Sequence, residues 1–214
     1  MKVVLYYAPI ACSLVPLISL YESGSDFEVR PVNMRKLEQM SPEYLKLNPK
    51  HKVPTLLIDG RPLTENVAMA VWMNRAFPKA GILPADPDAE IRAISVMAWC
   101  ASGIHPHLSR INSPLKFCDT PGSEEGTRRM SAKELDHVFE IANGMLEGRE
   151  YFFDKWCAAD SHFMWCWRRA TQFNLDYSKY AGCAAHYERM QKRPAVARAL
   201  DYEKQIQSEF ARAA

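Results

Sequence analysis

The stretch "YYAPIACSLVPLISL", residues 6–20, passes from an apolar run that favours a β-strand into a second apolar run with helical spacing. Pro9 marks the junction, and Cys12 and Ser13 stand side by side where the helix would begin. Unpaired backbone N–H groups and the positive end of a helix dipole meet at such a junction. Two interpretations stay open: the environment favours a reactive thiolate, or Ser13 caps the helix while Cys12 is a small buried residue.

Alternating strand and helix patterns organise the first part of the chain, residues 1–77. Asp59-Gly60 is typical of a tight hairpin turn between two short β runs. The predicted order is βαβ, then α, then ββα, which describes a small α/β layer with its own sheet. Strands are predicted at 2–7, 27–32, 54–59 and 61–64, and helical segments at 13–22, 41–47 and 65–77.

The second part of the chain has helical spacing throughout. Residues 78–88 are rich in Pro, Ala and Asp and are interpreted as a linker, and residues 89–214 as an all-helical domain. Ser131 and Glu134 fit a capping box at the start of one helix, and Gly148 fits its end. Helices are predicted at 89–110, 131–146, 158–170, 179–193 and from about 194 onward.

Composition excludes several classes of protein. The 27 Lys and Arg residues nearly balance the 25 Asp and Glu residues, so no basic surface for nucleic acid is indicated. No signal-peptide pattern and no apolar segment of membrane-spanning length occur, which predicts a cytoplasmic protein with no membrane partner. The six cysteines lack paired spacing and are expected to be reduced thiols. His105 and His107 have no acidic or cysteine partner at a metal-ligand spacing, so no metal site is predicted.

A second motif, "NPKHKVPTLLIDGRPLTENVAM" at residues 48–69, adds groups that can hold a peptide. Pro54 opens a strand without donating to the ladder, which leaves the backbone of Val53 available to an extended peptide. Glu65 and Asn66 begin a helix, where a carboxylate can accept an ammonium and backbone N–H groups can bind a carboxylate. The structural alternative is that the preceding threonine caps this helix. With the cysteine of the first motif, these groups predict a site for a small peptide that carries a thiol, an amino group and carboxylates.

At this point the sequence resembles the glutathione transferase family, and in particular its bacterial beta-type branch. The resemblance covers essentially the whole chain and implies a thioredoxin-like N-terminal domain followed by an all-helical C-terminal domain. It also implies a cytosolic homodimer that conjugates glutathione, its cosubstrate, to small hydrophobic electrophiles. The matching segments are "YYAPIACSLVP", "YESGSDFEVRPVNM", "NPKHKVPTLLIDGRPLTENVAM", "SGIHPHLSRI" and "QKRPAVARAL".

The resemblance implies which residues surround the reacting sulfur. It places Cys12 beside the glutathione sulfur, with Ser13 as the alternative hydroxyl donor. The backbone of Val53 would pair with the cysteinyl part of glutathione, next to a cis peptide bond at Pro54. His105 lies where beta-type proteins carry a histidine that faces the active cleft.

The two ends of glutathione are assigned by the same resemblance. Glu65 and Asn66 would hold the γ-glutamyl end, although the family has a small Ser or Gly where this chain has Asn66. The glycine carboxylate would face Lys52 and Lys36.

Two further departures concern the helical half. Pro106 stands where the best-known beta pattern has a lysine, which removes one charge from the cleft. The family's Ser/Thr-x-x-Asp capping box appears here as Cys157 to Asp160, and cysteine is a poor N-cap.

Alternatives of different kinds stay open beside the conjugating enzyme. A glutathione-dependent reductase, isomerase or ether-cleaving enzyme would use the same site with Cys12 as a covalent thiol. A noncatalytic binding protein could have the same fold, because fold alone does not determine activity. Four residues of the helical half either line an apolar pocket for the electrophile or pack in the core: Met97, Trp99, Cys100 and Ile104.

Overall fold

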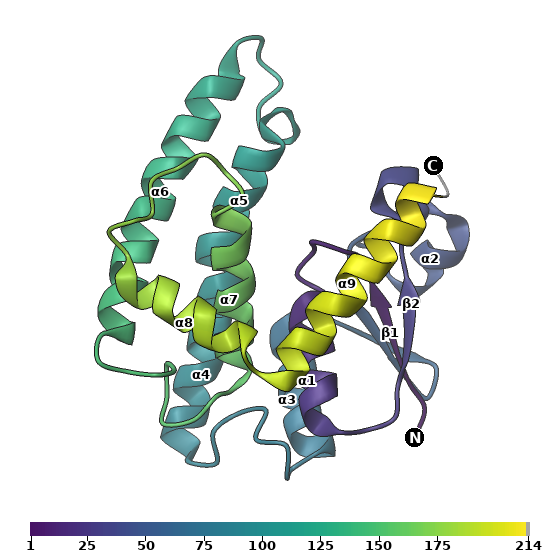
Figure 1. Ribbon diagram of the computed structural model, residues 1–214. Coiled ribbons are helices and arrows are strands. Elements are labelled where there is room, and N and C mark those ends of the chain that lie inside the picture. The colour runs from purple at the N-terminus through teal and green to yellow at the C-terminus, as the bar shows by residue number, and fades with distance from the viewer. Residues whose placement is uncertain (213–214) are drawn as a thin grey trace. The chain divides into compact units, whose positions relative to one another are not determined.

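A computed structural model describes residues 1–212, which form two compact units (Figure 1). The first unit contains residues 1–85 together with the C-terminal segment from Gln191, and the second contains residues 86–190. The C-terminal segment therefore packs with the N-terminal unit, whereas the sequence grouped it with the helical domain. Whether the units act as separate domains stays a prediction. No helix within the described residues is both long enough and apolar enough to span a membrane.

The first unit is built on a four-stranded sheet with strand order β2-β1-β3-β4. β1 pairs with β2 in parallel and with β3 antiparallel, and β3 pairs antiparallel with β4. Asp59 and Gly60 both have positive φ, 47° and 82°, as the expected hairpin turn requires. The four predicted strands are thus confirmed within a residue or two of their ends: β1 (Val3–Tyr7), β2 (Glu28–Pro31), β3 (Thr55–Ile58) and β4 (Arg61–Thr64).

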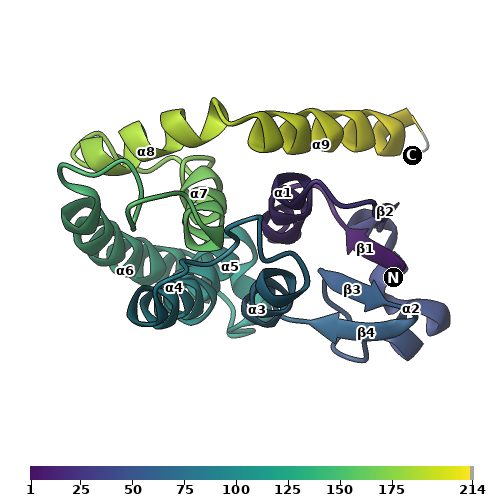
Figure 2. The same ribbon diagram turned by 90° about the horizontal axis from the view of Figure 1, so that it is seen from below.

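Helices cover both faces of this sheet, and the side chains along β1 point alternately toward one face and the other. Figure 2 shows α1 and α3 on one side of the sheet and α2 on the other. Tyr6 of β1 packs against Tyr44 of α2, whereas the fully buried Leu5 lies on the side of α1. α9 lies along α1 (Figure 1). The helices of this unit are α1 (Leu14–Ser23), α2 (Pro42–Leu47), α3 (Asn66–Ala76) and α9 (Pro194–Arg212), with short 3₁₀ turns η1 (Met34–Lys36) and η2 (Glu38–Met40).

The second unit is all-helical, as predicted. Its core is aromatic. The ring centroids of Phe139 and Trp167 lie 5.0 Å apart in an edge-to-face contact, and those of Phe163 and Phe152 lie 5.1 Å apart. α7 is buried along almost its whole length. The elements are α4 (Pro87–Trp99), the π-helical η3 (Cys100–Ile104), α5 (His105–Asn112), the 3₁₀ turn η4 (Pro114–Lys116), α6 (Ser123–Leu146), α7 (Ala158–Ala170) and α8 (Ala181–Gln191).

Two helix predictions in this unit were wrong in detail. The single helix expected at 89–110 is interrupted by η3, where the side chain of Trp99 closes over Gly103. A Cβ atom at Gly103 would lie 2.6 Å from Trp99 Cδ1, so this packing requires glycine. α6 begins at Ser123, and Ser131 is buried inside the helix instead of capping its start.

A buried carboxyl group fixes the start of α7. Asp160 is fully buried, and its Oδ2 accepts the N–H of Cys157 at 2.9 Å while its Oδ1 accepts the N–H of Phe152 at 3.0 Å. His186 Nε2 lies 3.0 Å from the same Oδ1. Asp160 therefore supplies its half of a capping box although cysteine occupies the N-cap position.

We expect Asp160→Ala to lower the free energy of unfolding by about 3 kcal/mol or more, because it leaves two buried N–H groups without acceptors. Asp154→Ala is the matched control, since Asp154 is exposed in the same loop and should change stability by less than about 0.5 kcal/mol. Urea unfolding followed by circular dichroism measures both. Equal stability of the two variants would contradict the capping role.

Candidate functional site

The loop between β1 and α1 carries Cys12 and is closed on itself by Ser13. Ser13 Oγ donates to the carbonyl of Ala8 at 2.9 Å and accepts the N–H of Ala8 at 3.0 Å. Ser13 is fully buried and makes no side-chain capping bond to α1. The capping interpretation of Ser13 was therefore wrong, because its hydroxyl is already used across the loop.

The same loop is held from the far end of the chain by Glu203 of α9. One carboxyl oxygen, Oε2, accepts the N–H of Ile10 at 2.7 Å and the hydroxyl of Tyr7 at 3.0 Å. Ile10 has φ of 68°, a conformation that is unfavourable for a β-branched residue. Glu203 is fully buried, so this contact supports a strained backbone just before Cys12.

Sequence reasoning missed Glu203, although a signal was present. The buried positions of α9 recur at helical spacing, and Glu203 is the charged residue within that apolar stripe. A carboxyl group on a buried helix face needs hydrogen-bond donors, and these were available only from an element distant in sequence.

We expect Glu203→Leu to destabilise the protein by about 2–4 kcal/mol, because the N–H of Ile10 and the hydroxyl of Tyr7 lose their acceptor. Glu203→Gln retains an acceptor oxygen and should recover most of that loss. Glu209→Leu, at an exposed position of the same helix, is the control. Chemical denaturation measures all three, and a Glu203→Leu variant as stable as Glu209→Leu would refute the role of Glu203.

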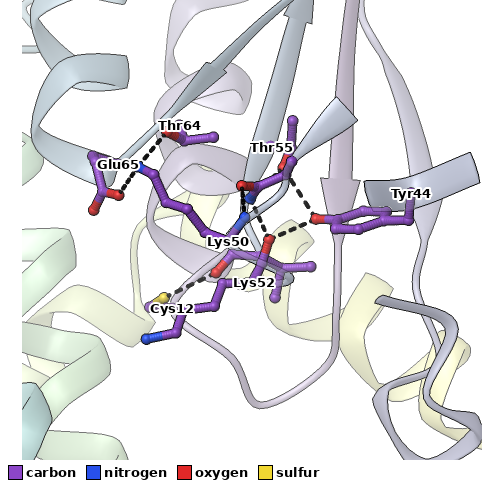
Figure 3. A network of polar contacts seen from close by, with 9 residues as sticks. Cys12, Tyr44, Lys50, Lys52, Thr55, Thr64 and Glu65 are labelled. Atoms are coloured by element: carbon purple, nitrogen blue, oxygen red, sulfur yellow. Dashed lines mark hydrogen bonds and ion pairs between the residues drawn. The ribbon is translucent and has the colours of Figure 1, made fainter. Parts of the chain in front are cut away.

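Cys12 lies where this loop meets the turn before β3 (Figure 3). Its Sγ donates to the carbonyl of Val53 at 3.6 Å, and its own carbonyl accepts Asn66 Nδ2 at 3.1 Å. The Val53–Pro54 peptide bond is cis, as expected. The structure thus brings together Cys12, the backbone of Val53 and the start of α3.

The Cys12 thiol is a proton donor at neutral pH. Burial raises its pKa to about 12, and the nearby carboxylate of Glu65 acts in the same direction. Hydrogen bonding from the Cys12 backbone and from Asn66, and the charge of Lys52, lower the pKa but do not offset burial. Desolvation of the sulfur thus opposes the thiolate that the helix start was expected to favour, although Cys12 as a residue keeps part of its surface exposed.

This pKa predicts slow alkylation of Cys12. At pH 8 a thiol with a pKa of about 12 is thiolate in roughly one molecule in ten thousand, and the thiolate is the reacting form. Cys12 and Cys118 are both partly exposed, but hydrogen bonds from Ser123 and Thr120 lower the pKa of Cys118, which should therefore react first. Iodoacetamide labelling followed by peptide mass spectrometry compares the two. Labelling of Cys12 at the rate of Cys118 would contradict this assignment.

A buried hydrogen-bond network shapes the turn that presents Val53. The carbonyl of Lys52 accepts the hydroxyl of Tyr44 and Nδ2 of Asn48, both at 2.7 Å. Asn48 Nδ2 also donates to Thr55 Oγ1 at 3.1 Å. This oxygen lies 3.0 Å from the hydroxyl of Tyr44 (Figure 3). Sequence reasoning missed Tyr44 and Asn48, whose role depends on two segments meeting in space.

The corner between β4 and α3 carries Glu65 in a strained conformation, with φ of 75°. Glu65 is the N-cap residue of α3 and its side chain makes no capping hydrogen bond, so the expected alternative of a Thr64 cap was wrong. Thr64 Oγ1 instead accepts Nζ of Lys50 at 2.8 Å, and the same ammonium pairs with Glu65 Oε1 at 2.6 Å. Both charged side chains are more than half exposed, at 52% and 65%.

The other residues predicted for the site, Lys52, Lys36 and His105, make none of the hydrogen bonds described above for Cys12. Lys52 is exposed and near enough to Cys12 for its charge to act on the thiol, whereas Lys36 lies exposed in η1. His105 belongs to the second unit, where it begins α5 and its ring contacts Trp165 at 4.6 Å. Within residues 1–212 no three or more His, Cys, Asp or Glu side chains are placed to hold a metal ion.

The four candidate pocket residues of the helical half separate into two kinds. Trp99 keeps part of its surface exposed. The other three are fully buried, as core residues are: Met97, Cys100 and Ile104.

Comparison with known proteins decides the family. The sequence model described as "Glutathione S-transferase, N-terminal domain" matches residues 1–71. The glutathione S-transferase GstA of Escherichia coli O157:H7 is 30% identical over 203 residues, which cover 93% of this chain and 98% of that protein. The chain belongs to the glutathione transferase family.

Solved structures agree with this glutathione transferase over nearly its whole length. A bacterial beta-class glutathione S-transferase of Sphingomonas chungbukensis is 28% identical, with a TM-score of 0.81 over 94% of this chain and 98% of that one. A sphingomonad glutathione S-transferase complexed with glutathione is 27% identical, with a TM-score of 0.82 over the same shares. The predicted family, its beta-type likeness and the fold are confirmed.

Proposed function

We propose that this glutathione transferase joins the glutathione thiolate to small hydrophobic electrophiles, and that the Cys12 thiol donates a hydrogen bond to that thiolate. The observation that supports this most directly is the Cys12 S–H, which is directed at the carbonyl of Val53, 3.6 Å away, beside the cis-Pro54 turn. A protonated donor and the backbone of Val53 thus lie at one place. Glutathione is the proposed cosubstrate because a solved relative is complexed with it.

The proposed binding mode uses residues of the first unit. The backbone of Val53 pairs with the cysteinyl part of glutathione, and Lys52, together with Lys36, attracts the glycine carboxylate. Glu65 and Asn66 hold the γ-glutamyl end at the start of α3, whose first N–H groups have no side-chain cap. Asn66 already donates to the carbonyl of Cys12, so binding at this end is coupled to the position of the sulfur donor.

The chemistry follows from what a thiol needs. Glutathione releases its thiol proton to solvent, and the thiolate attacks the electrophilic carbon. A C–S bond forms, and the leaving group departs with its electron pair. Cys12 keeps its proton and donates to the thiolate, which favours the charged form and lowers the pKa of the bound glutathione thiol. Ser13 takes no part, because its hydroxyl is buried and paired with Ala8.

The raised pKa of Cys12 favours conjugation over the alternatives that use Cys12 as a covalent thiol. A reductase, isomerase or ether-cleaving enzyme that uses Cys12 covalently needs its thiolate, which burial disfavours. Conjugation needs only the S–H donor. A noncatalytic binding protein would retain glutathione without turnover.

Three further expectations from the family resemblance stay predictions. They are a catalytic role for His105, assembly into a homodimer, and a cytoplasmic location.

We expect Cys12→Ala to reduce conjugation of a chlorinated nitrobenzene by about fivefold, since it removes one weak S–H donor worth about 1 kcal/mol. Cys12→Ser keeps a donor and should stay closer to the unaltered enzyme. A stopped-flow pH titration of bound glutathione absorbance should show a higher thiol pKa in Cys12→Ala. Complete loss of activity in Cys12→Ala, with turnover of a glutathione mixed disulfide by the unaltered enzyme, would favour the covalent alternative instead.

A further inference from the structure

Lys50 places a cation directly against Glu65. Its ammonium lies 2.6 Å from Glu65 Oε1 and 2.8 Å from Thr64 Oγ1, and Figure 3 shows the side chain reaching from the turn before β3 to the start of α3. This lysine precedes Lys52 by two positions and was not among the residues singled out from the sequence. The carboxylate that binds an ammonium in the proposed complex is therefore already paired with one.

The ion pair lies at the junction between β4 and α3, which has several features of a ligand-binding site. Glu65 holds a strained backbone with φ of 75°, and strain of this kind concentrates where ligands are held. The first turn of α3 contains no acidic residue and no side-chain cap, so its N–H groups and dipole favour an anion. Asn66 is 8% exposed, and its Oδ1 has no hydrogen-bond partner within the described residues.

The side-chain amide of Asn66 is already engaged at this corner. Asn66 stands where a small Ser or Gly was expected, and its Nδ2 donates to the carbonyl of Cys12 at 3.1 Å. The γ-glutamyl group of glutathione carries an α-ammonium and an α-carboxylate on one carbon atom. Glu65 matches only the first of these charges, whereas Glu65 and Lys50 together match both.

We propose that Lys50 binds the α-carboxylate of the γ-glutamyl group while Glu65 binds the adjacent α-ammonium. The inference rests on the proposed function and adds a binding residue to that site. In the free protein the two side chains neutralise one another. On binding, the ligand's amino acid group enters between them, and one ion pair is exchanged for two.

The energetics favour such an exchange. An ion pair between two half-exposed side chains contributes little to stability, so opening it costs little. The ligand groups pair with the same two charges next to the N-terminus of α3, where hydrogen bonds to charged groups are stronger. Lys50 moves only its flexible side chain, since its N–H donates to Asn48 Oδ1 at 3.1 Å and keeps the backbone in place.

Lys50→Met tests this with two ligands, glutathione and an analogue in which γ-aminobutyrate replaces the γ-glutamyl residue and the α-carboxylate is absent. Titration calorimetry should show that Lys50→Met weakens glutathione binding by roughly five- to tenfold, the range for a charge-assisted bond at a partly exposed site. Binding of the analogue should be unchanged by the same substitution. Lys46→Met, which removes an equal charge from the exposed surface of α2, should change neither affinity.

Each other outcome overturns the assignment. Equal losses for both ligands would show that Lys50 acts on the fold of the corner, and tighter glutathione binding by Lys50→Met would make Lys50 a competitor for Glu65. Unchanged glutathione binding would leave the lysine as a surface ion pair only. If the unaltered protein binds no glutathione, the proposed function itself fails; if it binds normally and only the Lys50 result is negative, the proposed function stands.

Discussion

A carboxyl group supplied from 193 positions further along the chain holds the backbone on which the whole site depends. Glu203 fixes Ile10 in a left-handed conformation, and Ser13 closes the same loop on Ala8. These bonds are buried, so their donors and acceptors have no water to replace a lost partner. The loop therefore has one arrangement, and that arrangement sets the place from which Cys12 donates.

The position of Cys12 explains how a helix start can carry a thiol without making it a thiolate. The sulfur is desolvated by the loop and by the turn at Val53, and Glu65 adds a negative charge nearby. A protonated Cys12 is suited to holding another sulfur's charge, not to attacking on its own.

Periodicity and turn chemistry were sufficient to predict the sheet, the helical half and the turn at Asp59-Gly60, because these signals are local. The same local signals misplaced the start of α6, since the pattern at Ser131 resembles a cap while the helix continues upstream on polar residues. The motif around Val53 and Glu65 predicted a peptide site, and the structure gathers those residues. Glu203, Tyr44, Asn48 and Lys50 escaped notice because each acts on a segment that only folding brings near. The role of Ser13 was misjudged for a related reason, as nothing in the sequence indicates that its hydroxyl is satisfied by Ala8.

The use of α9 as the anchor has a consequence for how the protein matures. α9 follows every other described element in the chain, yet it completes the loop between β1 and α1, the first two described elements. A nascent chain can form the sheet early, but the N–H of Ile10 lacks the carboxyl acceptor of Glu203 until α9 has been synthesised. The loop that carries Cys12 therefore reaches its final hydrogen bonding only after α9 has been made.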